Sequence, residues 1–172
     1  MKYVLGDLID MADSGFFDYI VHGCNCFNQM GGGIAFGISK RAPQAYAADC
    51  NTIKGDRNKL GTYTYAVIND SRSVNPYTII NAYTQYTFWD RNDMLSYSAV
   101  KSAFERIKAD FDSDPNYIPR IGIPLIGAGL AHGDWNRIED IIKSIGIRDL
   151  TIVIWNEHEA IKVNRLNQCN YN

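Results

Sequence analysis

Residues 19–35 read YIVHGCNCFNQMGGGIA, a strand-like run that passes directly into a glycine-rich loop. The first three residues are aromatic and β-branched, which is typical of a buried strand. A histidine, two cysteines and two asparagines follow, and three consecutive glycines then lead into Ile34 and Ala35. A glycine loop between a strand and a helix allows backbone N–H groups to approach a ligand. The stretch therefore predicts a binding site at the end of a strand in an α/β sheet.

Strand-like and helical patterns alternate through the rest of the chain. Strands are expected at residues 2–6, 19–24, 60–68, 77–86, 120–129 and 150–155, where 120–129 is a strand running into a glycine loop. Helices are expected at 33–41, with a further turn to Cys50, and at 96–111 and 134–145. The sequence thus predicts one α/β layered sandwich with a mixed sheet. The domain is expected at 1–160, and the polar residues 161–172 are expected to form a flexible tail or an edge contact.

Length and charge narrow the classes of function. With 172 residues, 46% of them hydrophobic, the chain can bury one substantial core. The net charge of -2, from 17 basic and 19 acidic side chains, makes nucleic acid an unexpected partner. No apolar run approaches the roughly 20 residues of a membrane span, and acidic residues come too early for a signal peptide. We expect a monomer in the cytoplasm, or in the host cytoplasm if the source is viral, with no membrane partner.

The four cysteines, Cys24, Cys26, Cys50 and Cys169, are expected to be free thiols, because a chain with a good core does not need disulfides. The C-x-C spacing of the first two is short for zinc, whose paired ligands usually stand about two to four residues apart, and no second pair follows. Neither a metal nor a cofactor is therefore expected. The two thiols are expected to fill small spaces at the end of a strand.

Two glycine loops each follow a strand and precede a helix, at Gly31-Gly32-Gly33 and at Gly127-Ala128-Gly129-Leu130. The N–H groups of such paired loops suit an anion with several oxygens, such as a diphosphate, although glycines also serve as turns and helix caps. The G-x-G-x-x-G fingerprint fails because Phe36 and His132 stand in the last glycine positions, and no G-K-[ST] occurs. A Rossmann dehydrogenase and a P-loop NTPase are both disfavoured.

Five motifs in this order resemble the macrodomain family of ADP-ribose-binding modules: V-L-G-D-L, I-V-H-G-C-N-C, G-G-G-I-A, I-P-L-I-G-A-G-L and the helix start W-N-R-I-E. The resemblance covers nearly the whole chain. It is strongest to the branch with the yeast ADP-ribose-1''-phosphate phosphatase and the terminal ADP-ribose glycohydrolases. It implies a three-layer α/β/α sandwich with a mixed, mostly parallel six-stranded sheet. ADP-ribose, its 1''-phosphate or an ADP-ribosylated target would lie in a cleft across the strand ends.

The resemblance also implies roles for individual residues. Asp7 would accept a hydrogen bond from the adenine amino group and repel the carbonyl of guanine, or it would cap the helical turn that follows. Asn25 would bind the distal ribose, and Trp155 would stack on adenine or pack in the core. The implied ligand contacts are Gly6, Asp7, Leu8, Asn25, Gly31, Gly32, Gly33, Ile34, Ala35, Ile126, Gly127, Ala128, Gly129, Leu130 and Trp155.

Catalysis is a separate prediction, carried by His22, Asn25 and Asp134. The resemblance implicates a histidine at the position of His22, where it could act as acid, base or nucleophile near neutral pH. The alternative is a neutral histidine that is hydrogen-bonded at the end of a buried strand. Asp134, together with His132, could orient a water molecule, or it could cap the following helix.

The chain also departs from relatives that release ADP-ribose from glutamate. Their lysine and aspartate are not evident here, since the corresponding regions read NAYTQY and Ala131. Hydrolysis of ADP-ribose-1''-phosphate is thus the leading expected reaction. The alternatives are a reader module that binds without cleaving and a hydrolase that removes ADP-ribose from a macromolecule.

Overall fold

The computed structural model describes residues 1–171, and these form a sandwich of helices around one mixed sheet. The sheet has seven strands in the order β3-β4-β2-β5-β6-β1-β7. The strands are β1 (Lys2–Leu5), β2 (Tyr19–Asn25), β3 (Tyr63–Ile68), β4 (Tyr77–Gln85), β5 (Arg120–Ile123), β6 (Asp149–Ile154) and β7 (Cys169–Tyr171). The helices are α1 (Leu8–Asp13), α2 (Gly33–Arg41), α3 (Pro43–Cys50), α4 (Tyr97–Phe111), α5 (Trp135–Ile145) and α6 (Glu157–Lys162).

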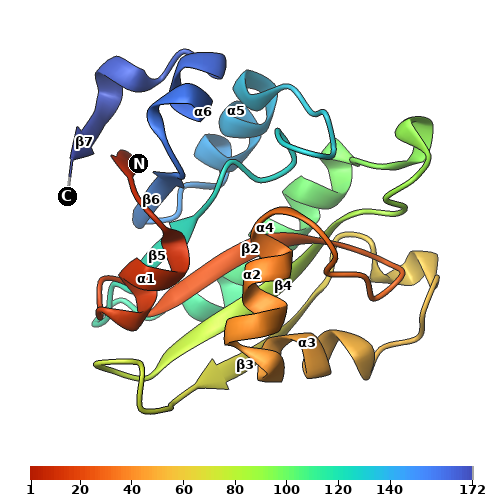
Figure 1. The fold of residues 1–172 in the computed structure, drawn as a ribbon, viewed down its shortest axis with the longest axis horizontal. Coiled ribbons are helices and arrows are strands. Elements are labelled where there is room, and N and C mark those ends of the chain that lie inside the picture. The colour runs from red at the N-terminus through yellow and green to blue at the C-terminus, as the bar shows by residue number, and fades with distance from the viewer. Residues whose placement is uncertain (172) are drawn as a thin grey trace.

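All neighbouring strands in the sheet run parallel except β3, which pairs antiparallel with β4 at one edge. In Figure 1, α2 and α3 lie in front of the sheet and α4 lies behind it. Because six strands run the same way, the carboxyl ends of β1, β2, β5 and β6 open onto the same end of the molecule. Crevices at this end are where open α/β sheets bind ligands.

Two hydrophobic cores fill the two faces of the sheet, as strand alternation requires. Along β2, Val21 packs with Phe104 of α4 and Ile138 of α5. Ile20, its neighbour in the chain, packs on the other face with residues of α1, α2 and α3, among them Ile38. The predicted α/β/α architecture is confirmed.

Local sequence explains where the helices begin and end. The Ser96 hydroxyl accepts a hydrogen bond from Ala99 N at 3.2 Å and caps α4, whose apolar side chains then repeat along one face. Gly146 ends α5 in the left-handed conformation at φ 71°, which glycine adopts without steric cost. Pro43 starts α3 and so separates it from α2.

The sheet has one strand more than the six predicted, because the predicted tail contributes to the fold. Cys169 pairs with Tyr3 and brings β7 alongside β1. Upstream, the Arg165 guanidinium binds the buried carboxylate of Glu139 in α5. A three-residue strand is too short to show a period in the sequence, so its pairing was not predictable.

Asn172, the last residue of the predicted tail, lies outside the described residues. No helix within residues 1–171 has the length and apolar character needed to cross a membrane.

Candidate functional site

The carboxyl ends of β1 and β6 lie side by side and bring together two segments that contain predicted ligand contacts, at Gly6 and at Trp155. Gly6 N donates to Ile154 O at 2.9 Å, which places the segment after β1 beside the segment after β6. The Trp155 side chain follows β6 directly and is 66% exposed. The prediction that Trp155 packs in the core is therefore wrong, and its side chain lies at the surface.

Asp7 caps helix α1. Its Oδ1 accepts from Ile9 N at 2.7 Å and from Asp10 N at 3.0 Å, so the capping role is confirmed. Arg41, at the end of α2, lies 3.7 Å from the same oxygen. No hydrogen bond or ion pair within residues 1–171 engages Asp7 Oδ2, so this atom can still accept a hydrogen bond. The adenine contact itself stays a prediction.

The start of α2 is a row of backbone donors with no side-chain partner. Gly32 occupies the N-cap position, has no side chain to accept from the helix, and no acidic residue follows in the first turn. By contrast, α1, α4, α5 and α6 each have a polar side chain that caps their first turn. The first N–H groups of a helix need acceptors and carry partial positive charge, so this end of α2 favours an anion.

The second glycine loop lies against the first. A Cβ built on Gly32 would lie 2.8 Å from Leu130 Cδ1, which shows how closely the two loops approach. Loop 124–133 is held in shape by its own backbone, since Gly133 N donates to Gly127 O at 2.7 Å and Ile126 N donates to Pro124 O at 2.8 Å. Gly127 has φ 74°, a conformation that favours glycine. The two predicted loops are thus brought together.

Asn25 shapes the glycine loop and has little hydrogen-bonding capacity left for a ligand. Its Oδ1 accepts from Phe27 N at 2.9 Å and from Gln29 N at 3.4 Å, and its Nδ2 donates to Gln29 O at 2.7 Å. The side chain is 7% exposed. An amide has two N–H donors, so one remains for a ribose hydroxyl.

His22 lies in the core and not at the surface. The imidazole is fully buried on the α3 side of the sheet, and its Nε2 is 2.7 Å from Asn81 Oδ1. Asn81 Nδ2 donates to Ala45 O and to Thr64 Oγ1, so Asn81 Oδ1 is the acceptor and His22 Nε2 carries the proton. Burial lowers the pKa of His22 to about 4, although the Asn81 hydrogen bond acts in the opposite direction. This geometry favours the second prediction for His22, a neutral histidine that is hydrogen-bonded in the core. Its partner is the side-chain amide oxygen of Asn81 rather than a backbone carbonyl.

Asp134 does not join His22. Its carboxylate accepts from Asn136 N at 2.9 Å and caps α5, while its backbone N–H donates to Tyr97 Oη at 3.0 Å. The capping role predicted for Asp134 is confirmed. Because α5 packs on the opposite face of the sheet from α3, the predicted catalytic residues do not converge on one point. His132 is exposed, with φ 56°.

Lys59 supports the glycine loop and was not predicted. Its ammonium group is 7% exposed, donates to Asn28 Oδ1 at 2.8 Å and to Cys26 O at 3.3 Å, and lies 3.6 Å from Asp49 Oδ1. It therefore ties the segment before the glycines to α3. Asn28 sits at φ 56°, a conformation that asparagine tolerates, and this contact holds it there. No local pattern marks a lysine 31 residues along the chain as a loop support.

Polar atoms without partners also lie near the site. Thr84 Oγ1 and Asp49 Oδ2 are buried and have no hydrogen-bond partner in the described part of the chain. A Cβ on Gly23 would lie 2.8 Å from Thr84 Oγ1, so only glycine fits between β2 and the end of β4. No group of three or more His, Cys, Asp or Glu residues able to hold a metal ion occurs among residues 1–171.

The sequence profile described as Macro domain matches residues 21–142, and the chain belongs to this family of ADP-ribose-binding folds. An Enterobacteria phage T4 protein, described as an uncharacterized 17.5 kDa protein in the tk-vs intergenic region, is 32% identical over 90% of this chain and 96% of its own length. A Debaryomyces hansenii protein named ADP-ribose 1''-phosphate phosphatase is 25% identical over 90% of this chain and 98% of its own length.

A solved structure supports the fold. Thermosipho africanus DarTG in complex with ADP-ribose superposes with a TM-score of 0.70 and 13% identity, covering 97% of this chain and 46% of that one. At this level of identity the likeness concerns the fold alone.

Proposed function

We propose that this protein binds one molecule of ADP-ribose per chain in the cleft between the two glycine loops. The observation that carries the proposal is the uncapped start of α2, which faces the loop of Leu130 and has neither a side-chain acceptor nor an acidic residue in its first turn. A diphosphate would supply the acceptors that Gly33, Ile34 and Ala35 need. The related fold of Thermosipho africanus DarTG was solved with ADP-ribose bound.

The proposed positions of adenine and of the distal ribose follow from the residues on either side of the diphosphate site. Adenine would lie toward Asp7 and Trp155, with its amino group on Asp7 Oδ2 and its face on the exposed indole. The distal ribose would lie toward Asn25 and use the remaining amide N–H. A carboxylate that accepts from adenine repels the carbonyl oxygen of guanine, so the site should select the base.

Titration calorimetry with ADP-ribose and with GDP-ribose tests this binding. We expect a 1:1 complex with ADP-ribose and a loss of about 1.5 to 3 kcal/mol with GDP-ribose, the value of one hydrogen bond to a charged group. Absence of heat or of a thermal shift with either ligand at millimolar concentration would refute the proposal.

The reaction that we propose for this site is hydrolysis of ADP-ribose-1''-phosphate to ADP-ribose and phosphate. It is supported by the Debaryomyces hansenii relative, which carries that name at 25% identity over 90% of this chain. Of the three predicted catalytic residues, Asn25 is the one at the glycine loop, and it would orient the terminal ribose. In this arrangement His22 is sealed in the core and Asp134 is engaged as a helix cap.

A reader module that binds without cleaving is the second candidate, and the buried position of His22 favours it. An imidazole that is fully buried and whose pKa is lowered to about 4 by burial has no contact with a bound ligand. Phosphate release from ADP-ribose-1''-phosphate decides between the two. Release above the buffer rate that disappears in Gly31→Glu supports the enzyme, whereas binding without release supports the reader.

A further inference from the structure

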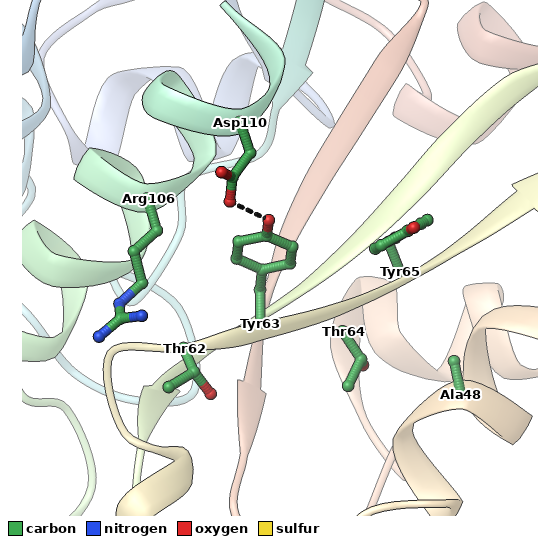
Figure 2. A pocket seen from close by; sticks show the side chains of 7 residues that line it. All are labelled: Ala48, Thr62, Tyr63, Thr64, Tyr65, Arg106 and Asp110. Atoms are coloured by element: carbon green, nitrogen blue, oxygen red, sulfur yellow. Dashed lines mark hydrogen bonds between the residues drawn. The ribbon is translucent and has the colours of Figure 1, made fainter.

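A groove of about 480 Å³ follows the outer edge of β3, separated from β2 by β4 (Figure 2). It is lined by Ala48, Thr62, Tyr63, Thr64, Tyr65, Arg106 and Asp110. These residues come from β3 and the residue before it, from α3 on one face of the sheet and from α4 on the other. The groove is therefore the free edge of the sheet, framed by two helices.

The backbone of β3 offers hydrogen-bonding groups to this groove. Within residues 1–171, β3 pairs with β4 alone, and Tyr83 N donates to Thr62 O at 3.0 Å. In an antiparallel pair, successive residues point their N–H and C=O groups alternately toward and away from the partner strand. Since the carbonyl of Thr62 and the backbone groups of Thr64 point toward β4, those of Tyr63 and Tyr65 point outward into the groove.

This edge lacks the features that usually protect an edge strand. Natural edges carry lysine, proline, inward charges or a covering segment. β3 reads YTYAVI, without a charged residue or a proline, and it exposes 53% of Tyr65 and 57% of Val67. The exposed side chains lie on the α4 face, next to the ring of Phe111 at the end of that helix. An apolar, unblocked edge of this kind is suited to receive another strand.

The walls of the groove favour an extended segment as the occupant. α3 and α4 both line the edge, so a single strand can enter between them, whereas the edge of a second folded copy would bring its own helices against them. Arg106 forms no hydrogen bond or ion pair with any residue in 1–171, and the nearby Asp110 carboxylate is already engaged by the Tyr63 hydroxyl. The cation at the rim is thus free to bind an acidic side chain.

We propose that the β3 edge docks an extended segment of a partner protein, which adds to the sheet as a strand and places an acidic side chain against Arg106. The side chains that the segment turns toward α3 would meet the small residues Ala48, Thr62 and Thr64, which leaves room for large apolar residues there. Acidic residues on one side of the segment and large apolar residues on the other define its chemistry. β3 itself contains no acidic residue, and the Asp110 carboxylate beside it is engaged by the Tyr63 hydroxyl, so a second copy of this edge would bring no free carboxylate to Arg106.

A displayed library of random dodecapeptides, selected on the full chain, tests the proposal. We expect enriched peptides in which an acidic residue alternates with β-branched or aromatic residues. A synthetic enriched peptide should shift the backbone amide signals of Tyr63, Tyr65 and Val67 in nuclear magnetic resonance spectra of the labelled protein.

Two charge reversals on α4 provide the matched comparison. Arg106→Glu should weaken the peptide at least about tenfold, a loss of about 1.4 kcal/mol, whereas Lys101→Glu, an equal charge change outside the groove, should leave its affinity unchanged. Circular dichroism should show both variants folded. The proposal is overturned if no peptide is enriched, if Arg106→Glu binds as well as the wild type, or if the shifts lie outside the β3 edge. Sedimentation velocity that shows a dimer dissociated by Val67→Lys would also overturn it, since the occupant would then be a second copy.

Discussion

Gly32 and Leu130 bring the two glycine loops into contact: a Cβ on Gly32 would lie 2.8 Å from Leu130 Cδ1. The contact joins the start of α2 to the loop after β5, two segments almost a hundred residues apart in the chain. Leu130 is nonetheless 68% exposed, so its side chain does not fill a core. The two loops therefore meet at the surface, where Gly33 is exposed and Ile34 and Ala35 are partly exposed.

Gly31→Glu should abolish ADP-ribose binding without loss of stability. A Cβ at Gly31 meets no atom within 4 Å, and its backbone is not left-handed, so the new side chain fits. The carboxylate would add a negative charge where the diphosphate is expected and would compete for the N–H groups of α2. Calorimetry and thermal unfolding measure the two effects, and an unchanged dissociation constant would place the ligand elsewhere.

Gly33→Ala is the companion variant, because it separates backbone strain from ligand contact. Gly33 has φ 54°, and an alanine there should cost about 1 to 2 kcal/mol of unfolding free energy. A lower urea midpoint is therefore expected for Gly33→Ala but not for Gly31→Glu. Equal midpoints for the two variants would contradict the left-handed conformation at Gly33.

Lys59→Met should loosen the segment that carries the glycine loop. The methionine keeps much of the apolar stem but removes the donor to Asn28 Oδ1 and Cys26 O, and it leaves Asp49 buried without its cation. We expect faster amide hydrogen exchange in residues 26–33 and weaker ADP-ribose binding. Lys54→Met, a change of the same type at an exposed position, is the control. Exchange in 26–33 that matches the wild type would show that Lys59 does not hold this loop.

His22→Ala should act on stability. It leaves a cavity and removes the partner of Asn81 Oδ1, at a cost of about 2 to 4 kcal/mol of unfolding free energy. His22→Gln, which can still donate to Asn81, should recover part of this. ADP-ribose affinity per folded molecule should be unchanged, and a selective loss of phosphate release in a stable His22 variant would instead restore its predicted catalytic role.

The pKa of His22 also predicts a pH dependence. Because burial lowers the folded pKa from 6.5 to about 4, the stabilisation by the neutral imidazole is complete above pH 6.5 and is lost as the pH falls through this window. Urea unfolding of the wild type should therefore weaken between pH 6.5 and 4 more than that of His22→Gln. Parallel curves for the two proteins would show that the imidazole is not held neutral.

Glu139→Gln should lower the free energy of unfolding, and this loss should depend on pH in a more acidic range than the effect of His22. Burial raises the pKa of Glu139, but hydrogen bonds from Arg165, Lys143 and Tyr3 outweigh it and hold the pKa at about 2, below the ordinary 4.5. The stabilisation is present above pH 4.5 and is lost as the pH falls toward 2. The wild type should exceed Glu139→Gln at pH 7 by more than at pH 3 in urea unfolding.

Glu105→Gln is the control for that experiment, because Glu105 is exposed and forms an ion pair with Lys101 on the same helix. Its difference from the wild type should be small at both pH values. A Glu139→Gln difference that does not shrink at pH 3 would mean that Glu139 is not ionised in the folded protein.

Local sequence determined the helices and loops that have a long hydrophobic pattern, a capping residue or a run of glycines. Residues 96–111 carry an apolar stripe and a serine cap, and the structure has α4 at Tyr97–Phe111. The glycines at 31–33 and 127–129 marked the two loops, and both lie at carboxyl ends of parallel strands. Such features depend on neighbours within one or two turns, which is the information that a sequence pattern contains.

Tertiary contacts decided the rest. Whether His22 faces the surface or the core depends on Asn81, its partner on the neighbouring strand β4, and the support of the glycine loop depends on Lys59. The strand at Cys169–Tyr171 exists because β1 offers it an edge, not because three residues prefer to be extended. Sequence therefore determined the longer helices and strands and the two glycine loops, but not the three-residue strand β7. Only the folded chain decided which of these residues are exposed, because burial and pairing arise from contacts between segments far apart in the chain.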